Sequence, residues 1–189
     1  ALKAMNRYPE AIVDLTSLFV KDTTDTKILI DLAECYKLMG SPRQAADYYR
    51  KAVSLRPNNK FFRLQYIRSL LNAENFKEAR DACHGWLEQD TVSATGYKYL
   101  GQAYEGMQDI PNAFFSYNVA YRRDSLDAQT VARIANIFNN NRQFTDAIDV
   151  TECYRLSDTT SVDVNRQNAK AYCMLKDYKK AIERYESLK

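Results

Sequence analysis

The most restrictive feature of this sequence is the segment from Tyr97 to Ala120, in which large and small apolar residues recur at helical spacing. The residues expected to share a face are Tyr97, Leu100, Gly101 and Tyr104 in the first half and Ala113, Tyr117 and Ala120 in the second. Residues three and four positions apart lie on the same side of an α-helix. The segment therefore predicts two consecutive amphipathic helices.

Small residues stand where these two helices are expected to cross. Gly101 and Ala113 lack bulk, so the two backbones can approach closely while Tyr104 and Tyr117 fill the space on either side. Pro111 suits the first turn of the second helix, because its missing N–H would be unpaired there in any case. The segment thus predicts an antiparallel helix hairpin.

This pattern of large and small residues resembles the tetratricopeptide repeat, a 34-residue unit made of two antiparallel helices. The resemblance rests on the two sets of face residues given above. It implies an all-α fold, a right-handed α-α superhelix (a solenoid of antiparallel helix pairs). It also implies a scaffold whose work is to hold other proteins, an inference by analogy of fold.

A 34-residue frame laid from this hairpin continues in both directions without insertion or deletion. It predicts one solenoid domain over residues 1–189, with helices of about 12 to 15 residues. The complete repeats are 26–59, 60–93, 94–127 and 128–161, and partial repeats cover 1–25 and 162–189.

Repeat 60–93 departs most from the family pattern. Arg63 stands where the family prefers an aromatic residue, and Trp86 stands where alanine is usual. The single tryptophan could anchor a ligand, but aromatic residues at helical spacing usually lie in the core. We therefore expect Trp86 to have a packing role.

The composition favours a folded helical chain that is not embedded in a membrane. Of the 189 residues, 46% are hydrophobic and 27% are charged, and only five are glycine and four are proline. No apolar run approaches 18 residues, so we expect no membrane span. The sequence leaves the compartment open between the cytoplasm and the bacterial periplasm.

The sequence offers little for metal binding or catalysis. The four cysteines, Cys35, Cys83, Cys153 and Cys173, form no C-x-x-C pair, and we expect them to be small buried hydrophobic side chains. His84 is the only histidine, and no nucleophile, metalloprotease or phosphate-loop motif is present. We expect no cofactor and no enzymatic activity.

In the family, the concave surface is lined by positions 2, 5, 6, 9, 12 and 13 of the first helix of each repeat. The resemblance therefore implies a partner-binding groove made of mostly polar residues. The predicted groove residues are Gln65, Arg68, Lys98, Tyr99, Gln102, Arg133, Asn136, Asn139, Asn140, Arg166, Gln167 and Lys170. Carboxamide and guanidinium groups suit an extended peptide, because the former bind its backbone and the latter bind acidic side chains.

Charge favours an acidic partner in this groove. The lining positions also include Lys27, Asp31, Glu34, Lys37, Glu105 and Asp163, which brings the set to seven cations and four anions. That surplus of +3 equals the net charge of the whole chain, and it increases towards the carboxyl-terminal repeats. A solvated helix face also carries charges, so each residue taken singly has a structural explanation.

Two other readings stay open from the sequence alone. The chain could be an assembly module that associates with itself through exposed ends of the solenoid. Binding of nucleic acid is disfavoured, because a net charge of +3 falls short of a strongly basic surface. Our leading hypothesis is a scaffold for an extended acidic peptide segment of another protein.

Overall fold

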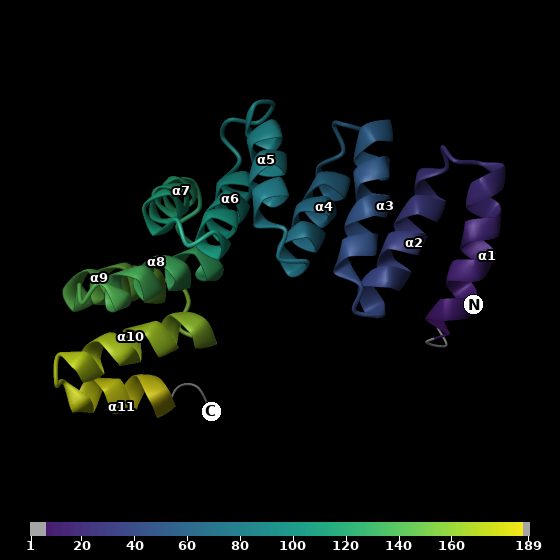
Figure 1. Ribbon diagram of the computed structural model, residues 1–189. Helices are drawn as coiled ribbons and strands as arrows, with labels where there is room; N and C mark the ends of the chain where they lie inside the picture. Colours follow the sequence, from purple (N-terminus) through teal and green to yellow (C-terminus); the bar gives the residue numbers. More distant parts are fainter. Residues whose placement is uncertain (1–6, 187–189) are drawn as a thin grey trace. The chain divides into compact units, whose positions relative to one another are not determined.

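A computed structural model of the protein describes residues 7–186, which form eleven α-helices and no β-strand (Figure 1). The helices are α1 (Tyr8–Lys21), α2 (Thr26–Leu38), α3 (Pro42–Leu55), α4 (Lys60–Asn72), α5 (Phe76–Leu87), α6 (Ala94–Gly106), α7 (Ile110–Arg123), α8 (Ala128–Asn140), α9 (Phe144–Arg155), α10 (Val162–Met174) and α11 (Tyr178–Glu186). Each complete predicted repeat contains two of them, and the all-α fold of antiparallel helix pairs is confirmed. The outer ends of the two partial repeats, 1–6 and 187–189, lie outside the described residues.

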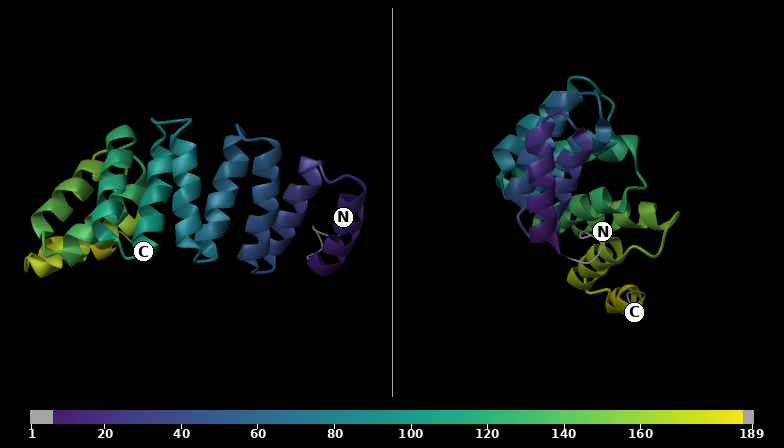
Figure 2. Two further views of the ribbon diagram at one scale, coloured as in Figure 1. Left: turned by 45° about the horizontal axis from the view of Figure 1, so that its top comes forward. Right: turned by 90° about the vertical axis from the view of Figure 1, so that its right-hand side faces the viewer.

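The chain divides into two compact units, residues 1–89 and residues 90–189. In the first unit, α1 to α5 follow one another as neighbouring antiparallel helices (Figures 1 and 2). In the second unit, α6 packs on α7, α8 on α9, and α10 on α9, α11 and α8. Because α8 and α10 are the first helices of successive repeats, their contact creates a shared face. The single solenoid domain over 1–189 stays a prediction.

The first helix of each repeat begins after a polar residue that recurs every 34 positions. These residues are Asp25, Asn59, Ser93, Asp127 and Ser161, and each side chain accepts a hydrogen bond from a backbone N–H of the first helical turn. Such a cap stabilises a helix by about 1 kcal/mol, because it satisfies a donor that has no partner within the helix. The caps therefore fix where each repeat starts.

The turn within each helix pair contains a residue with positive φ, and this residue also recurs every 34 positions. The five are Gly40, Glu74, Gln108, Arg142 and Lys176, with φ between 56° and 71°. The next residue donates its N–H to a carbonyl five positions earlier, as in Asp109 to Tyr104 at 2.9 Å. This is the hydrogen-bond pattern of a Schellman motif. Four repeats thus hold a non-glycine residue in a conformation that glycine adopts more easily.

The close helix crossing expected at Gly101 is confirmed. A Cβ atom built on Gly101 would lie 2.6 Å from both Cδ1 and Cε1 of the Tyr117 ring, which is closer than real Cβ contacts. Tyr117 is fully buried and belongs to a core cluster with Ala113 and Ile134, against which Tyr104 packs. Glycine at this position is therefore required by the tyrosine of the opposing helix.

In repeat 60–93, the two unusual residues are both buried. Trp86 is 3% exposed, which confirms its packing role. Arg63 is 7% exposed, and its guanidinium donates to the backbone oxygen of Pro57 and to Oε1 of Gln89. A buried charge at a core position is thus satisfied by the turn that precedes α4 and by the residues that follow α5.

The expectation that all four cysteines are buried was wrong for two of them. Cys35 and Cys83 are buried, whereas Cys153 and Cys173 are exposed, and none of the four forms a disulfide. Cys173 occupies position 12 of its repeat, one of the groove positions of the first helix, so helical phase places it towards solvent. Cys153 lies on the exposed side of α9.

Buried polar residues join the last three helices. Asn168, fully buried in α10, donates from Nδ2 to Oγ1 of Thr151 in α9 at 2.7 Å and accepts from Nε of Arg184 in α11 at 3.1 Å. Arg155 of α9 donates to Asn165, which is also buried in α10. The preceding repeats use apolar or aromatic residues at the position of Asn168, so the helix packing here depends on hydrogen bonds.

Candidate functional site

The first helices of the second unit, α6, α8 and α10, carry most of the predicted groove residues. We call the surface that these three helices present the A face of unit 2. Four side-chain contacts link successive repeats along the A face. They are Lys98 with Asp127, Glu105 with Arg133, Asn139 with Gln167, and Asn140 with Lys170. The contacts join residues 28 to 30 positions apart. The helices of the A face are therefore held together by polar bonds as well as by their core.

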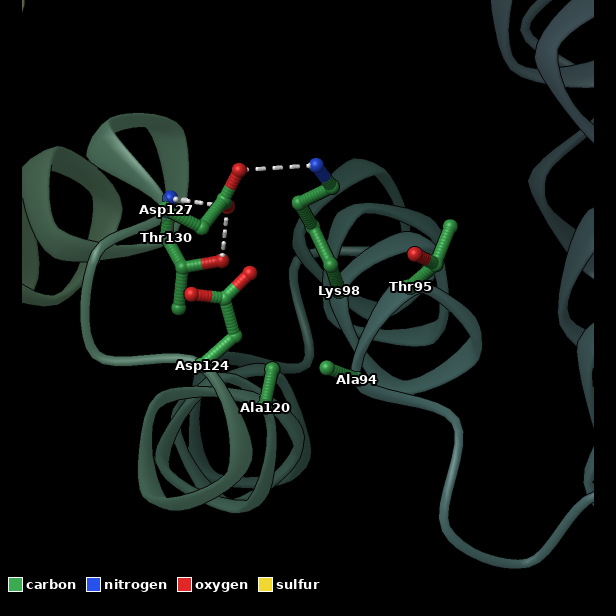
Figure 3. Close-up of a pocket in the computed structure, with 7 residues that line it drawn as sticks. All are labelled: Ala94, Thr95, Lys98, Ala120, Asp124, Asp127 and Thr130. Atoms are coloured by element: carbon green, nitrogen blue, oxygen red, sulfur yellow. Dashed lines mark hydrogen bonds and ion pairs between the residues drawn. The ribbon is translucent and has the colours of Figure 1, made fainter.

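Lys98 reaches the beginning of the next repeat. Its Nζ lies 3.0 Å from Oδ1 of Asp127, and the two side chains are 17% and 25% exposed (Figure 3). The other oxygen of Asp127 accepts hydrogen bonds from the backbone and hydroxyl of Thr130, which completes the N-cap of α8. Burial alone would raise the pKa of Asp127, but the bonds from Thr130 and Lys98 outweigh it and the pKa is lowered.

A hollow of only about 20 Å³ lies beside this ion pair, lined by Lys98, Asp124, Asp127 and Thr130 among others (Figure 3). The space is about that of a single water molecule. Lys98 therefore acts chiefly as a link between α6 and α8, and this corner offers no room for a peptide side chain.

Arg133 of α8 is held by α6 through one end of its guanidinium. Nη1 lies 3.0 Å and 3.1 Å from the two carboxylate oxygens of Glu105. Glu105 in turn accepts from the hydroxyl of the buried Tyr117 at 2.7 Å. Burial, together with the carboxylate of Glu105, raises the pKa of Tyr117, so this hydroxyl stays a donor. The core tyrosine thus fixes the carboxylate that orients Arg133.

Four further predicted groove residues form two contacts between α8 and α10. Asn139 is 4% exposed, and its Nδ2 donates to the backbone oxygen of Gln167 at 3.0 Å and to its side-chain oxygen at 3.1 Å. Lys170 donates to Oδ1 of Asn140 at 3.2 Å, and both residues are exposed. Asn139 therefore lies beneath the surface as a link between helices, while Asn140 and Lys170 remain accessible.

A hollow of about 230 Å³ opens on the A face between α8 and α10. Its lining residues are Gln129, Ala132, Arg133, Asn136, Asp163 and Gln167. We call it the α8–α10 hollow. Four of the six occupy groove positions named from the sequence, and the other two, Gln129 and Ala132, occupy positions 2 and 5 of the same repeat. The repeat position was thus a signal for these two as well, although their residue types carry no charge.

The remaining predicted residues are spread more widely. Gln65 is half-buried and Arg68 exposed on α4, in unit 1. Tyr99 and Gln102 are half-buried on α6, and Nζ of Lys98 lies 5.5 Å from the centre of the Tyr99 ring. Arg166 is exposed on α10. These residues do not line the α8–α10 hollow.

The charge of the A face is lower than the sequence count indicated. Lys98, Arg133 and Arg166 each have a carboxylate partner, at 3.0 Å, 3.0 Å and 3.1 Å. Asp127, the partner of Lys98, is the residue immediately before α8 and was not counted among the groove positions. The groove positions of the A face hold four cations and two anions, a surplus of +2, and including Asp127 reduces this surplus to +1.

No group of three or more His, Cys, Asp or Glu side chains within residues 7–186 is placed to hold a metal ion. None of the helices in the described part of the chain is long and apolar enough to cross a membrane.

Comparison with known proteins identifies the repeat directly. The sequence model described as "Tetratricopeptide repeat" matches residues 26–59, the first complete repeat of the predicted frame. No curated protein sequence matches the chain.

Solved structures of repeat proteins share the fold. PilF of Pseudomonas aeruginosa is 16% identical with a TM-score of 0.74, over 97% of this chain and 83% of that one. MamA of Desulfovibrio magneticus RS-1 is 19% identical with a TM-score of 0.67, over 83% and 91%. YrrB, described as a tetratricopeptide repeat protein with an unusual peptide-binding site, is 16% identical with a TM-score of 0.61, over 92% and 89%. At these identities the likeness shows the fold alone.

Tetratricopeptide repeats are generally scaffolds for interaction between proteins rather than enzymes, and the helix pairs of such repeats are found in this chain. Residues 26–59 thus match the tetratricopeptide repeat, and the chain as a whole shares its fold with solved tetratricopeptide repeat proteins.

Proposed function

We propose that this protein is a scaffold that binds an extended, acidic peptide segment of another protein along the A face of unit 2. The observation that carries the proposal is the α8–α10 hollow, in which Arg133 lies among three carboxamide side chains. Carboxamides both donate and accept, so they can bind the backbone of an extended peptide. A guanidinium can bind a carboxylate with two parallel hydrogen bonds.

The accessible cations of unit 2 support an acidic partner. Among residues 7–186, Arg166 pairs only with Asp163 of its own helix, and the two side chains are 57% and 68% exposed. Exposed ion pairs of this kind contribute little to stability, so a carboxylate of the partner protein can replace Asp163 as the ligand of Arg166. Lys170 is exposed, and within the described part of the chain it is bound only by the neutral side chain of Asn140. Both cations lie on α10, next to the hollow.

The experiment measures binding of synthetic, fluorescently labelled peptides of about ten residues, long enough to span three helices that are each roughly 10 Å apart. Three peptides differ only at alternate positions, which carry Glu, Gln or Lys. We expect the Glu peptide to bind most tightly and its affinity to fall as salt rises, because exposed charges are screened within about 8 Å at physiological ionic strength.

The variant Arg133→Glu with Arg166→Glu should weaken binding of the Glu peptide. The matched control is Arg122→Glu with Lys179→Glu, which makes the same change in net charge at exposed residues of the second helices α7 and α11. Arg155 is unsuitable as a control because its guanidinium is bound to the buried Asn165. An equal loss of binding in both double variants would show that net charge, and not the A face, governs the interaction.

A second candidate function is self-association through α11, and a specific difference between repeats favours it. Tyr185 is 46% exposed, whereas the residues at the same repeat position, Tyr49, Cys83, Tyr117 and Thr151, are fully buried. Among residues 7–186 no following helix pair covers the ring of Tyr185, and in this candidate a second molecule of the chain covers it. Light scattering that grows with protein concentration, and is abolished by Tyr185→Ser, would support this candidate. A monomer at all concentrations would exclude it.

A further inference from the structure

The α8–α10 hollow carries one cation and one anion, and they come from different helices. Arg133 is contributed by α8 and Asp163 by α10. The other polar lining residues, Gln129, Asn136 and Gln167, are neutral carboxamides. A uniformly acidic segment would satisfy the α8 side of the hollow and meet a like charge on the α10 side. The charge pattern of the hollow therefore differs from that of the A face as a whole.

The guanidinium of Arg133 is only partly used within the protein. Glu105 binds Nη1 alone, and Nη2 and Nε have no hydrogen-bond partner among residues 7–186. The Arg133 side chain is 43% exposed. Two N–H groups are therefore available for a carboxylate, and Glu105 keeps the guanidinium oriented while they bind.

Asp163 is also available to a ligand. Its Oδ1 accepts from Arg166 at 3.1 Å, and no interaction of Oδ2 is present among residues 7–186. The carboxylate is 68% exposed. Because the pair with Arg166 is exposed and lies within one helix, it holds the carboxylate only weakly. An ammonium or guanidinium from a peptide can therefore bind Asp163 without displacing a buried contact.

Resting on the proposed function, we infer that the α8–α10 hollow selects a peptide segment of mixed charge, with an acidic residue bound to Arg133 and a basic residue bound to Asp163. Packed helices lie about 8–10 Å apart, and an extended chain advances about 3.1–3.3 Å per residue. The two charged residues of the peptide should therefore be about three positions apart. The carboxamides between them bind the intervening backbone.

The test uses four synthetic peptides of equal length that differ only at two positions three residues apart. These positions carry Glu and Lys, Lys and Glu, Glu and Glu, or Lys and Lys. We expect one of the two mixed orders to bind about two- to fivefold more tightly than the Glu–Glu peptide, the range that an exposed ion pair provides. The mixed order that binds more tightly, Glu before Lys or Lys before Glu, shows the direction in which the peptide crosses α8 and α10.

The variant Asp163→Lys should reverse the preference, so that the Glu–Glu peptide binds most tightly. The control is Asp146→Lys, which makes the same charge change at an exposed acid in the first turn of α9 and should leave the preference unchanged. Asp163→Asn should remove the preference for a mixed peptide with less disturbance of the helix start, and circular dichroism of each variant checks that the helices are retained.

The outcomes separate this inference from the proposed function. If the Glu–Glu peptide binds the native protein at least as tightly as both mixed peptides, the selection by Asp163 is refuted, while binding of an acidic segment stands. If Asp146→Lys changes the preference as much as Asp163→Lys, the hollow is not the site of selection. If none of the four peptides binds, both the inference and the proposed function are overturned.

Discussion

The substitution Gly101→Ala tests the central packing contact of unit 2. The added Cβ would lie 2.6 Å from two ring atoms of Tyr117 and 3.0 Å from a third. The ring is fully buried, and its hydroxyl is bound to Glu105 at 2.7 Å, so it has no free direction in which to move. Overpacking of this kind costs about 1–3 kcal/mol. The better helix propensity of alanine offsets about 1 kcal/mol of that.

We therefore expect Gly101→Ala to lower the free energy of unfolding, by up to about 2 kcal/mol. For a unit of this size the loss corresponds to a fall in Tm of about 4–8 °C per kcal/mol. Urea titration followed by far-ultraviolet circular dichroism measures it. The fluorescence of Trp86, the only tryptophan, follows unit 1 in the same titration and serves as an internal reference.

Gly85→Ala is the matched control for this prediction. Gly85 lies inside α5, and a Cβ there would meet nothing within 4 Å. The same substitution should therefore stabilise the protein by about 0.5–1 kcal/mol, because alanine has the better helix propensity and its Cβ clashes with no other atom here. If Gly101→Ala also stabilised the protein, the crossing at Tyr117 would not be tightly packed and the reasoning would be refuted.

Two further predictions concern the turns and the caps. Gly40 has a φ of 71° and open space around its missing Cβ, so Gly40→Ala should cost about 1 kcal/mol through backbone conformation alone; unchanged thermal stability would contradict this. Asp127→Asn keeps a cap acceptor but removes the charge that faces Lys98. Because folding lowers the pKa of Asp127, its charge stabilises the protein above the unfolded value of about 3.9, and this contribution is lost as pH falls through the lower folded pKa. The difference between native protein and variant in urea titrations should thus shrink below about pH 4, and a difference independent of pH would refute the assignment.

Much of the fold could be predicted because the information is local. The spacing of apolar residues indicates each helix, and the 34-residue frame locates the pairs. Gly101 and Tyr117 could be recognised as a crossing because both belong to a single hairpin. The positive φ at four of the five turns could not be predicted from the sequence, since Glu74, Gln108, Arg142 and Lys176 are not residue types that favour this conformation.

The sequence by itself determined which helix face each groove residue occupies, because helical phase follows from position along the chain. Only the tertiary structure decided what each side chain does there. Asp127 neutralises Lys98 from 29 residues away, and Asn139 is buried against Gln167 of the following repeat. These two contacts depend on distances of about 3 Å between side chains of successive repeats, and a pattern of residue types does not specify those distances.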